Sequence, residues 1–214
     1  MKVSCVIPTY EMKGDGLAFL QRALRSIESQ MFEDYEVVVT DDSRDGVIEE
    51  YCNQVDGLRY FKNEQRLGMA GNTNKGIEMA EGELVKILYQ DDYFYDKWSL
   101  HRMVKGFTPS YIWLATACTH TLDGIHFVNP HLPFYSHSEN TIGSPSVTMI
   151  RKAITEKFDT KLTWVLDLEF YRRLYKKYGK PKILNDINVV IGLHKNQTTH
   201  LLTNEEKLKE QQTL

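Results

Sequence analysis

Two pairs of adjacent aspartates, each at the end of an apolar run, are the residues of this chain best suited to chemistry. Asp91-Asp92 follows the run 84–88, and Asp41-Asp42 follows the run 36–40. Carboxylate oxygens are hard ligands that hold divalent cations, and a cation at such a place usually serves phosphates. Either pair alone could be a polar turn that caps the next helix. The occurrence of two such pairs favours a binding site.

The spacing of apolar residues predicts alternating strands and helices in the first half of the chain. Apolar runs rich in β-branched residues predict buried strands at 3–7, 36–40, 58–61 and 84–88. Helical spacing predicts helices over 17–31, 46–54, 70–81 and 95–106, with Gly82 as the residue that ends the third. Strands joined in this way predict a parallel sheet in a Rossmann-like α/β half.

Parallel strands end at one edge of a sheet, so the residues that follow them can lie together. Pro8, Thr9, Tyr10 and Glu11 follow the first predicted strand and can therefore join both aspartate pairs. A carboxylate there could accept a hydrogen bond from a nucleotide base or a ribose, while a cation neutralises the phosphates. The chain has no GxGxxG after the first strand and no GxxxxGK[ST] motif, which argues against dehydrogenases and P-loop kinases.

The second half of the chain is less regular. We expect strands at 111–119 and 183–193, an apolar segment at 146–150, a helix at 165–178, and a hairpin from Asp123-Gly124 into 125–128. Residues 130–144 are expected to form a loop over the site. We expect one domain, with a nucleotide-binding half at 1–106, an acceptor-side half at 107–200 and a peripheral tail at 201–214.

Composition limits the class of protein. A formal net charge of −3 over 214 residues gives no electrostatic case for a nucleic-acid partner. Cys5, Cys52 and Cys118 are too scattered for a metal site of the CxxC type, and their odd count suggests a reducing compartment. We expect no signal peptide, no membrane span and a cytoplasmic location, with contact at a membrane surface and homodimer formation left open.

Several segments together resemble the family 2 glycosyltransferases of the GT-A fold. The first three are 3–11 (VSCVIPTYE), 36–43 (EVVVTDDS) and 68–76 (GMAGNTNKG), and Gln90-Asp91-Asp92 then falls at the place of the family's DxD motif. Their order and spacing match over roughly residues 3–105. The segments 143–151 and 165–174 resemble acceptor-side segments of the same family.

This resemblance implies an enzyme that moves a sugar from a nucleotide-diphosphate sugar, with a UDP-sugar as the expected donor. The acceptor would be a hydroxyl of a glycan or another molecule, the reaction would invert the anomeric carbon, and Mn²⁺ or Mg²⁺ would be required. The donor-binding residues that it implies are Pro8, Thr9, Tyr10, Glu11, Asp41, Asp42, Arg66, Gln90 and Asp91.

The resemblance also implies roles for single residues at the donor site. Asp42, or Asp41, would accept a hydrogen bond from a uracil-type base, and Arg66 would lie over the base or its phosphates. Asp91 would contact the ribose. Gln90 could accept from a ribose hydroxyl or a metal-bound water.

The metal ligands implied by the resemblance are Asp92, Asp91 and His194. The first position of the DxD motif is occupied by Gln90, or by Tyr89 if the alignment shifts by one. Which of the two aspartates holds the metal therefore stays open. His194 follows a predicted strand, and its imidazole is a plausible third ligand, although a structural role is equally compatible with its position.

Asp167 is the candidate general base. An inverting transfer needs a carboxylate near the acceptor hydroxyl to remove its proton. The family often has a Glu-Asp pair at this helix start, whereas this chain has Leu166-Asp167. Asp167 could instead cap its helix, and Glu169 is a weaker candidate on another face. Trp164 could stack on a sugar or pack in the core.

Two other functions fit parts of this pattern. A sugar nucleotidyltransferase would carry a glycine-rich basic loop after the first strand, but residues 8–16 offer only Lys13, Gly14 and Gly16. A non-catalytic nucleotide-binding or glycan-binding module would explain the incomplete DxD motif and the single acidic residue at 167. Turnover of a nucleotide sugar distinguishes this second alternative from the enzyme.

Overall fold

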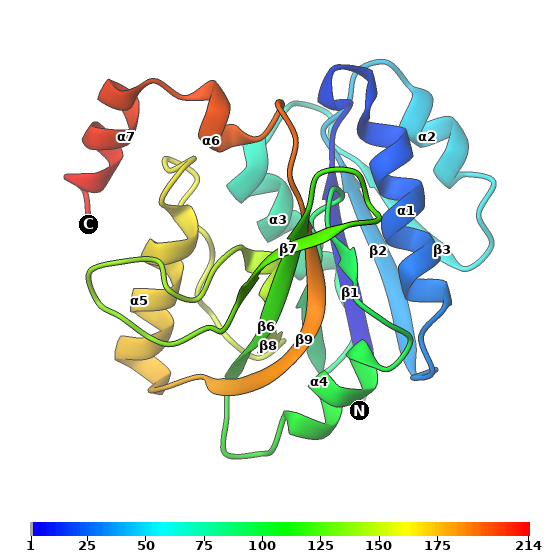
Figure 1. Ribbon diagram of the computed structural model, residues 1–214. Coiled ribbons are helices and arrows are strands. Elements are labelled where there is room, and N and C mark those ends of the chain that lie inside the picture. Colours follow the sequence, from blue (N-terminus) through cyan, green and yellow to red (C-terminus); the bar gives the residue numbers. More distant parts are fainter. Residues whose placement is uncertain (1) are drawn as a thin grey trace.

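This computed structural model describes residues 2–214, and Met1 lies outside them. The strands of the described residues form one mixed β-sheet of nine strands (Figure 1). The strand order is β3-β2-β1-β4-β8-β6-β9-β5, and β7 pairs with β6. The strands are β1 (Val3–Thr9), β2 (Tyr35–Asp41), β3 (Leu58–Lys62), β4 (Leu84–Ile87), β5 (Tyr93–Phe94), β6 (Trp113–Thr121), β7 (Phe127–His131), β8 (Thr148–Arg151) and β9 (Lys182–Gly192). The α-helices are α1 (Gly16–Glu28), α2 (Val47–Cys52), α3 (Gly68–Met79), α4 (Ser99–Gly106), α5 (Leu166–Tyr178), α6 (Thr198–Leu201) and α7 (Asn204–Gln211).

The predicted parallel half is confirmed. Strands β1, β2, β3 and β4 are parallel neighbours, and every residue of β1 is buried, as its continuous apolar run predicts. Thr9 at the end of β1 pairs with Asp41 at the end of β2. Because β4 runs in the same direction on the other side of β1, the three strands end at one edge of the sheet. The fold class is therefore the predicted α/β fold.

The second half extends this sheet with strands of mixed direction. Strand β8 is antiparallel to both β4 and β6, and the long strand β9 runs parallel to β6. Strand β9 also pairs with the short strand β5, which directly follows the Asp91-Asp92 turn. The end of β9 is thus held beside the end of β4. Residues far apart in the sequence meet there.

Several predicted helix boundaries are wrong, and the helix expected over 17–31 already ends at Glu28. The helix expected over 95–106 begins only at Ser99, because residues 93–94 form β5 and pair with β9. Gly82 does not end a helix, since α3 already ends at Met79. A Cβ atom on Gly82 would lie 2.7 Å from the carbonyl oxygen of Lys2, and its N–H donates to Oγ of Ser4 at 2.8 Å. This glycine is therefore required by close packing against β1.

Other predicted elements of the second half are confirmed. The hairpin at Asp123-Gly124 joins β6 to β7, and the helix expected over 165–178 is α5. The polar tail forms α7, which Thr203 and Glu206 begin with a reciprocal capping box. The loop expected over 130–144 is shorter than predicted, because β7 extends to His131.

One cluster of buried hydrophobic residues includes members of both halves, such as Ile87 of β4 and Trp113 of β6. Trp113 of β6 stacks on Tyr171 of α5 with ring centroids 5.6 Å apart, and Phe158 stacks on Phe170 at 4.1 Å. These contacts fix α5 against the sheet, so that the start of the helix has a defined place relative to the strand ends. None of the helices in residues 2–214 is both long and apolar enough to cross a membrane.

Candidate active site

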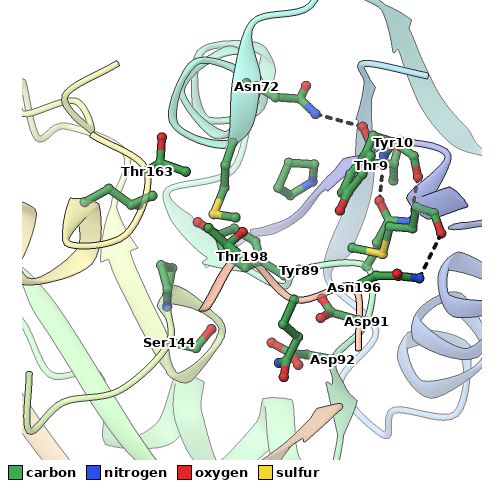
Figure 2. A pocket seen from close by; sticks show the side chains of 18 of the residues that line it. Thr9, Tyr10, Asn72, Tyr89, Asp91, Asp92, Ser144, Thr163, Asn196 and Thr198 are labelled. Atoms are coloured by element: carbon green, nitrogen blue, oxygen red, sulfur yellow. Dashed lines mark hydrogen bonds between the residues drawn. The ribbon is translucent and has the colours of Figure 1, made fainter. Parts of the chain in front are cut away.

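A cavity of about 370 Å³ lies at the edge where β1, β2 and β4 end (Figure 2). Every predicted site residue except Glu11 and Asp41 lines this cavity. Its lining consists of Pro8, Thr9, Tyr10, Met12, Asp42, Arg66, Gly68, Met69, Asn72, Tyr89, Gln90, Asp91, Asp92, Ser144, Pro145, Thr163, Trp164, Leu166, Asp167, Ile191, His194, Asn196, Gln197, Thr198 and Thr199. The predicted strand-end residues and the predicted helix-start aspartate therefore face one space.

Asp42 lines the cavity and also organises the loop before α3. Its carboxylate accepts hydrogen bonds from the main-chain N–H groups of Leu67, at 3.0 Å, and Gly68, at 2.8 Å. The side chain of Asn63 donates to Oδ1 of Asp42 at 2.8 Å. Asn72, on α3, holds the neighbouring loop by donating to the carbonyl of Thr9 at 3.0 Å (Figure 2). The carboxylate of Asp42 is thus held in place at the end of β2.

Asp41 is turned away from the cavity. Its carboxylate accepts from the hydroxyl of Tyr60 at 2.7 Å, from Ser43 Oγ at 2.7 Å and from Nζ of Lys62 at 3.0 Å. Burial alone would raise the pKa of Asp41, but these donors hold it below its ordinary value. Of the two alternatives for a base-binding aspartate, the geometry favours Asp42, and the role itself stays a prediction.

Gln90 fastens the loop after β1 to the loop after β4. Its Oε1 accepts from the N–H of Tyr10 at 2.6 Å, and its Nε2 donates to the carbonyls of Tyr10 and Gly16 at 3.0 and 3.1 Å. Both ends of the amide are therefore occupied within the protein. At the place where the resemblance puts the DxD motif, this glutamine thus holds main-chain groups and presents no charge.

Glu11 and Arg66 form an ion pair at the rim of the cavity. Arg66 itself lines the cavity and is half-exposed, whereas Glu11 lies behind it. The guanidinium is tethered to the segment that follows β1. An anionic ligand in the cavity would therefore compete with Glu11 for this guanidinium.

Asp91 contacts residues from both ends of the chain. Its Oδ2 lies 2.9 Å from Nε2 of His194, and its carbonyl oxygen accepts from Nη2 of Arg22 at 2.6 Å. Arg22 in turn lies over the ring of Tyr93, 4.7 Å from the centroid. The imidazole of His194 packs against Phe19 with ring centroids 4.8 Å apart. The predicted proximity of Asp91 and His194 is therefore present in the structure.

Asp92 is buried next to Asp91. Its Oδ1 accepts from the main-chain N–H of Gly192 at 3.0 Å. Burial first, and then the charge of Asp91, raise the pKa of Asp92 well above its ordinary value. Lys86 lies beneath this pair, where burial lowers its pKa to about 7, and its ammonium donates to the carbonyls of Ile87, at 2.6 Å, and Ser146. Two adjacent carboxylates in a buried place are the kind of site at which a cation is stabilising.

The chemistry of these donors fits a divalent cation. Asp91 and Asp92 offer carboxylate oxygens, which suit Mn²⁺ and Mg²⁺. Both ring nitrogens of His194 have partners within the protein, Oδ2 of Asp91 at 2.9 Å and the N–H of Asn196 at 3.2 Å, so the imidazole could bind a metal only by giving up one of them. In residues 2–214 no three His, Cys, Asp or Glu side chains are already arranged to hold a metal ion by themselves.

Asp167, in the first turn of α5, faces the cavity from the side opposite the strand ends. Its Oδ2 accepts from Nδ2 of Asn140 at 2.6 Å, and its Oδ1 accepts from the N–H of Leu168 at 2.7 Å. Burial raises the pKa of Asp167 to about 7 in spite of these donors. Glu169 is instead paired with Arg173 at 2.6 Å, away from the cavity lining. Asp167 can therefore exchange a proton near neutral pH.

Several residues that line the cavity are not predicted from the sequence. Asn72 lies in the segment 68–76, and the pattern there could have indicated it as a residue that faces the strand ends. Asn196, Thr198 and Thr199 come from the chain after β9, where no periodic pattern marks them. Asn140, in the predicted loop, donates a hydrogen bond to Asp167. Their roles depend on tertiary contacts that only the fold reveals.

Comparison with solved structures shows the type of fold. TarS from S. aureus in complex with UDP-GlcNAc matches with a TM-score of 0.77 and 22% identity, over 99% of this chain and 64% of that chain. The mannosyltransferase PcManGT from Pyrobaculum calidifontis, in complex with GDP-Man and Mn²⁺, matches with a TM-score of 0.63 and 17% identity, over 89% of this chain and 56% of that chain. These likenesses confirm the predicted GT-A fold of glycosyltransferases.

The sequence then gives the family. The model of glycosyl transferase family 2 matches residues 4–174, so the chain belongs to this family, as the resemblance implied. The GalNAc(5)-diNAcBac-PP-undecaprenol beta-1,3-glucosyltransferase of Campylobacter jejuni is 33% identical over 96 residues, which are 42% of this chain and 30% of that protein. An uncharacterized protein of Mycobacterium tuberculosis is 25% identical over 99% of this chain and 74% of its own length. The chain thus spans less than a third of the C. jejuni relative.

Proposed function

We propose that this chain transfers a sugar from a nucleotide-diphosphate sugar to an acceptor hydroxyl, with inversion at the anomeric carbon and with a divalent cation. The observation that carries the proposal is that Asp167, with a pKa raised to about 7, faces the same cavity as Asp42, Asp91 and Asp92. A donor bound along the strand ends would place its sugar near a carboxylate that can accept a proton. A module that only binds nucleotides has no use for such a group.

The nucleotide would lie across the ends of β1 and β2. Asp42 is held there by main-chain donors, and Tyr10 and Arg66 line the adjoining wall. The guanidinium of Arg66 would face the base or its phosphates. TarS, whose fold this chain shares, is known in complex with UDP and with UDP-GlcNAc, which supports a UDP-sugar as the first donor to test.

The diphosphate would lie at the Asp91-Asp92 turn. When bound there, Mn²⁺ or Mg²⁺ would offset the negative charge of the leaving diphosphate. Gly192 and His194 hold the two carboxylates through hydrogen bonds, at 3.0 and 2.9 Å, and so fix their orientation at the cavity wall. The Mn²⁺ in the PcManGT complex supports this assignment.

Asp167 would act as the general base. It takes the proton of the acceptor hydroxyl while the hydroxyl oxygen bonds to the anomeric carbon. The bond from this carbon to the diphosphate oxygen breaks at the same time, so the nucleoside diphosphate leaves and the configuration inverts. Asn140 orients the carboxylate through its bond of 2.6 Å. The C. jejuni relative is named as a glucosyltransferase that acts on a lipid-linked glycan, GalNAc(5)-diNAcBac-PP-undecaprenol, which supports a glycan hydroxyl as the acceptor.

A donor screen tests this proposal. Purified protein is mixed with UDP-, GDP- and dTDP-sugars and Mn²⁺ or EDTA, and the released nucleoside diphosphate is measured. We expect release from one donor that EDTA abolishes and that is lost in Asp92→Ala and Asp167→Asn. Metal-dependent binding without release, even with a broad acceptor panel, would favour the binding module. Release of inorganic diphosphate when a nucleoside triphosphate and a sugar phosphate are supplied would favour the nucleotidyltransferase.

A further inference from the structure

Helix α5, which carries Asp167, is capped at its start by a residue of helix α7. Among the described residues, no side chain of the local sequence caps the start of α5 at Val165. The carboxylate of Glu210, on α7, instead accepts hydrogen bonds from Trp164 N–H at 2.7 Å and Val165 N–H at 3.1 Å. The N–H of Thr163 lies 3.0 and 3.1 Å from its two oxygens. Three consecutive main-chain donors thus converge on one carboxylate.

Two of these three donor residues belong to the wall of the cavity. Thr163, Trp164 and Asp167 all line it, and Asp167 is the second residue of α5 (Figure 2 shows Thr163 on this wall). A second contact comes from α7, where Nζ of Lys207 lies 5.7 Å from the centroid of the Trp164 ring. In Figure 1, α7 lies beyond the end at which α5 begins. The segment treated as a peripheral tail in the sequence therefore sets part of the site.

The contact between Glu210 and the start of α5 also affects the ionisation of Asp167. The start of a helix carries a partial positive charge, which favours the ionised form of a carboxylate in the first turn. Glu210 brings a negative charge to the same place. The other titratable groups that interact with Asp167 are the hydroxyls of Tyr89 and Tyr171, and burial raises the pKa of both, so they are neutral. Asn140 is an uncharged donor, and the ammonium of Lys207 donates to the carbonyl of Thr199 at 2.7 Å, beside the Trp164 ring.

We propose that Glu210 is a positioning residue for Asp167: it fixes the first turn of α5 and opposes the helix field there, so that Asp167 stays basic enough to accept a proton. This role rests on the proposed function of Asp167, although its effect on the carboxyl group does not depend on turnover. Glu210 acts through main-chain groups and does not touch the reacting atoms.

The experiment is a titration of the Asp167 carboxyl carbon by NMR, with ¹³C-labelled aspartate and with Asp167→Asn to assign the signal. Glu210→Gln removes the charge and keeps the shape and one acceptor oxygen. We expect the pKa of Asp167 to fall by roughly 0.2–0.7 pH unit, the size of a single charge acting at a helix end. Glu205→Gln removes a charge from the exposed first turn of α7 and is the matched control, with no expected change.

Kinetics give the second readout. We expect Glu210→Ala to lower kcat about tenfold or more, since small displacements of a catalytic group are costly, while the Kd of UDP stays unchanged. An Asp167 signal that titrates at the same pH in Glu210→Gln and in the wild type would overturn the proposal. If Glu210→Ala does not fold, the titration of Glu210→Gln still decides. If the wild type releases no nucleoside diphosphate, the proposed function fails, whereas the titration still measures the action of Glu210 on Asp167.

Discussion

Nε2 of His194 lies 2.9 Å from Oδ2 of Asp91, although 103 positions separate the two residues in the sequence. The contact exists because β9 pairs with both β6 and β5, and so ends beside the turn that follows β4. A hydrogen bond between an imidazole and a carboxylate orients both groups. In metal sites, such support is commonly worth a factor of about 10–100 in metal affinity.

We therefore expect His194→Ala to raise the Mn²⁺ concentration that gives half-maximal activity by about 10–100-fold. The measurement is the initial rate of UDP release at increasing Mn²⁺ with a fixed donor. His101→Ala, on the exposed side of α4, is the control and should leave this concentration unchanged. An unaltered Mn²⁺ requirement in His194→Ala would mean that the imidazole neither binds nor supports the metal.

A second prediction concerns the close approach of Gly192 to the Asp91-Asp92 turn. A Cβ atom on Gly192 would lie 2.3 Å from the carbonyl oxygen of Asp91 and 2.9 Å from Nη2 of Arg22. Gly192→Ala should therefore displace the turn and destabilise the protein by about 1–3 kcal/mol, as overpacking does elsewhere. Unfolding in urea measures the stability, and UDP release measures the activity. The activity of the variant should fall by more than the loss of folded protein explains. Full activity in a protein of unchanged stability would contradict this packing.

A third prediction is the pH dependence of the reaction. A general base must be unprotonated, and burial raises the pKa of Asp167 to about 7. We expect kcat/KM to be constant above this pH and to fall tenfold for each pH unit below it. Initial rates between pH 5 and 9, with saturating metal, give this profile. A rate that stays constant down to pH 5 would exclude Asp167 as the base.

The raised pKa of Asp167 predicts that Asp167→Asn gains stability relative to the wild type as the pH rises. A carboxyl group whose pKa is higher in the folded protein stabilises the fold at low pH, and this contribution is lost as the pH rises through about 7. Asparagine cannot ionise. The free energy of unfolding of the variant, relative to the wild type, should therefore increase by about 1–4 kcal/mol between pH 4 and pH 8.

Urea unfolding at the two pH values measures this difference. Asp186→Asn, in the exposed part of β9, is a suitable control because the same change of residue type there should not depend on pH in this way. A difference that is the same at both pH values would show that the carboxyl of Asp167 titrates normally in the folded protein.

The sequence predicts the strand-end part of the site well because local patterns and strand direction are enough to place it. The runs before Thr9, Asp42 and Asp91 are rich in apolar residues, and parallel strands bring their ends to one edge. Asp41 shows the limit of this reasoning. The sequence cannot say which of two adjacent aspartates faces the cavity, since that depends on the donors of Tyr60 and Lys62 from β3.

The remainder of the site depends on contacts between distant segments. Asn140 in a loop and Glu210 in the tail reach the start of α5 from 27 and from 45 to 47 positions away in the sequence. Neither lies in a run with a period that sequence reasoning can use. The short strand β5 was likewise missed, because two residues that pair with β9 do not form a pattern.

The central claim is that one cavity binds the nucleotide sugar and that Asp167 acts only in the chemical step. The direct measurement compares the wild type with Asp167→Asn in two assays, the Kd of UDP by calorimetry with Mn²⁺ and the kcat for the donor found in the screen. We predict that the Kd changes less than about twofold while kcat falls by about 10²–10⁴, the usual contribution of a general base. A variant that retains the wild-type kcat, or that loses UDP binding in proportion to kcat, would contradict the account.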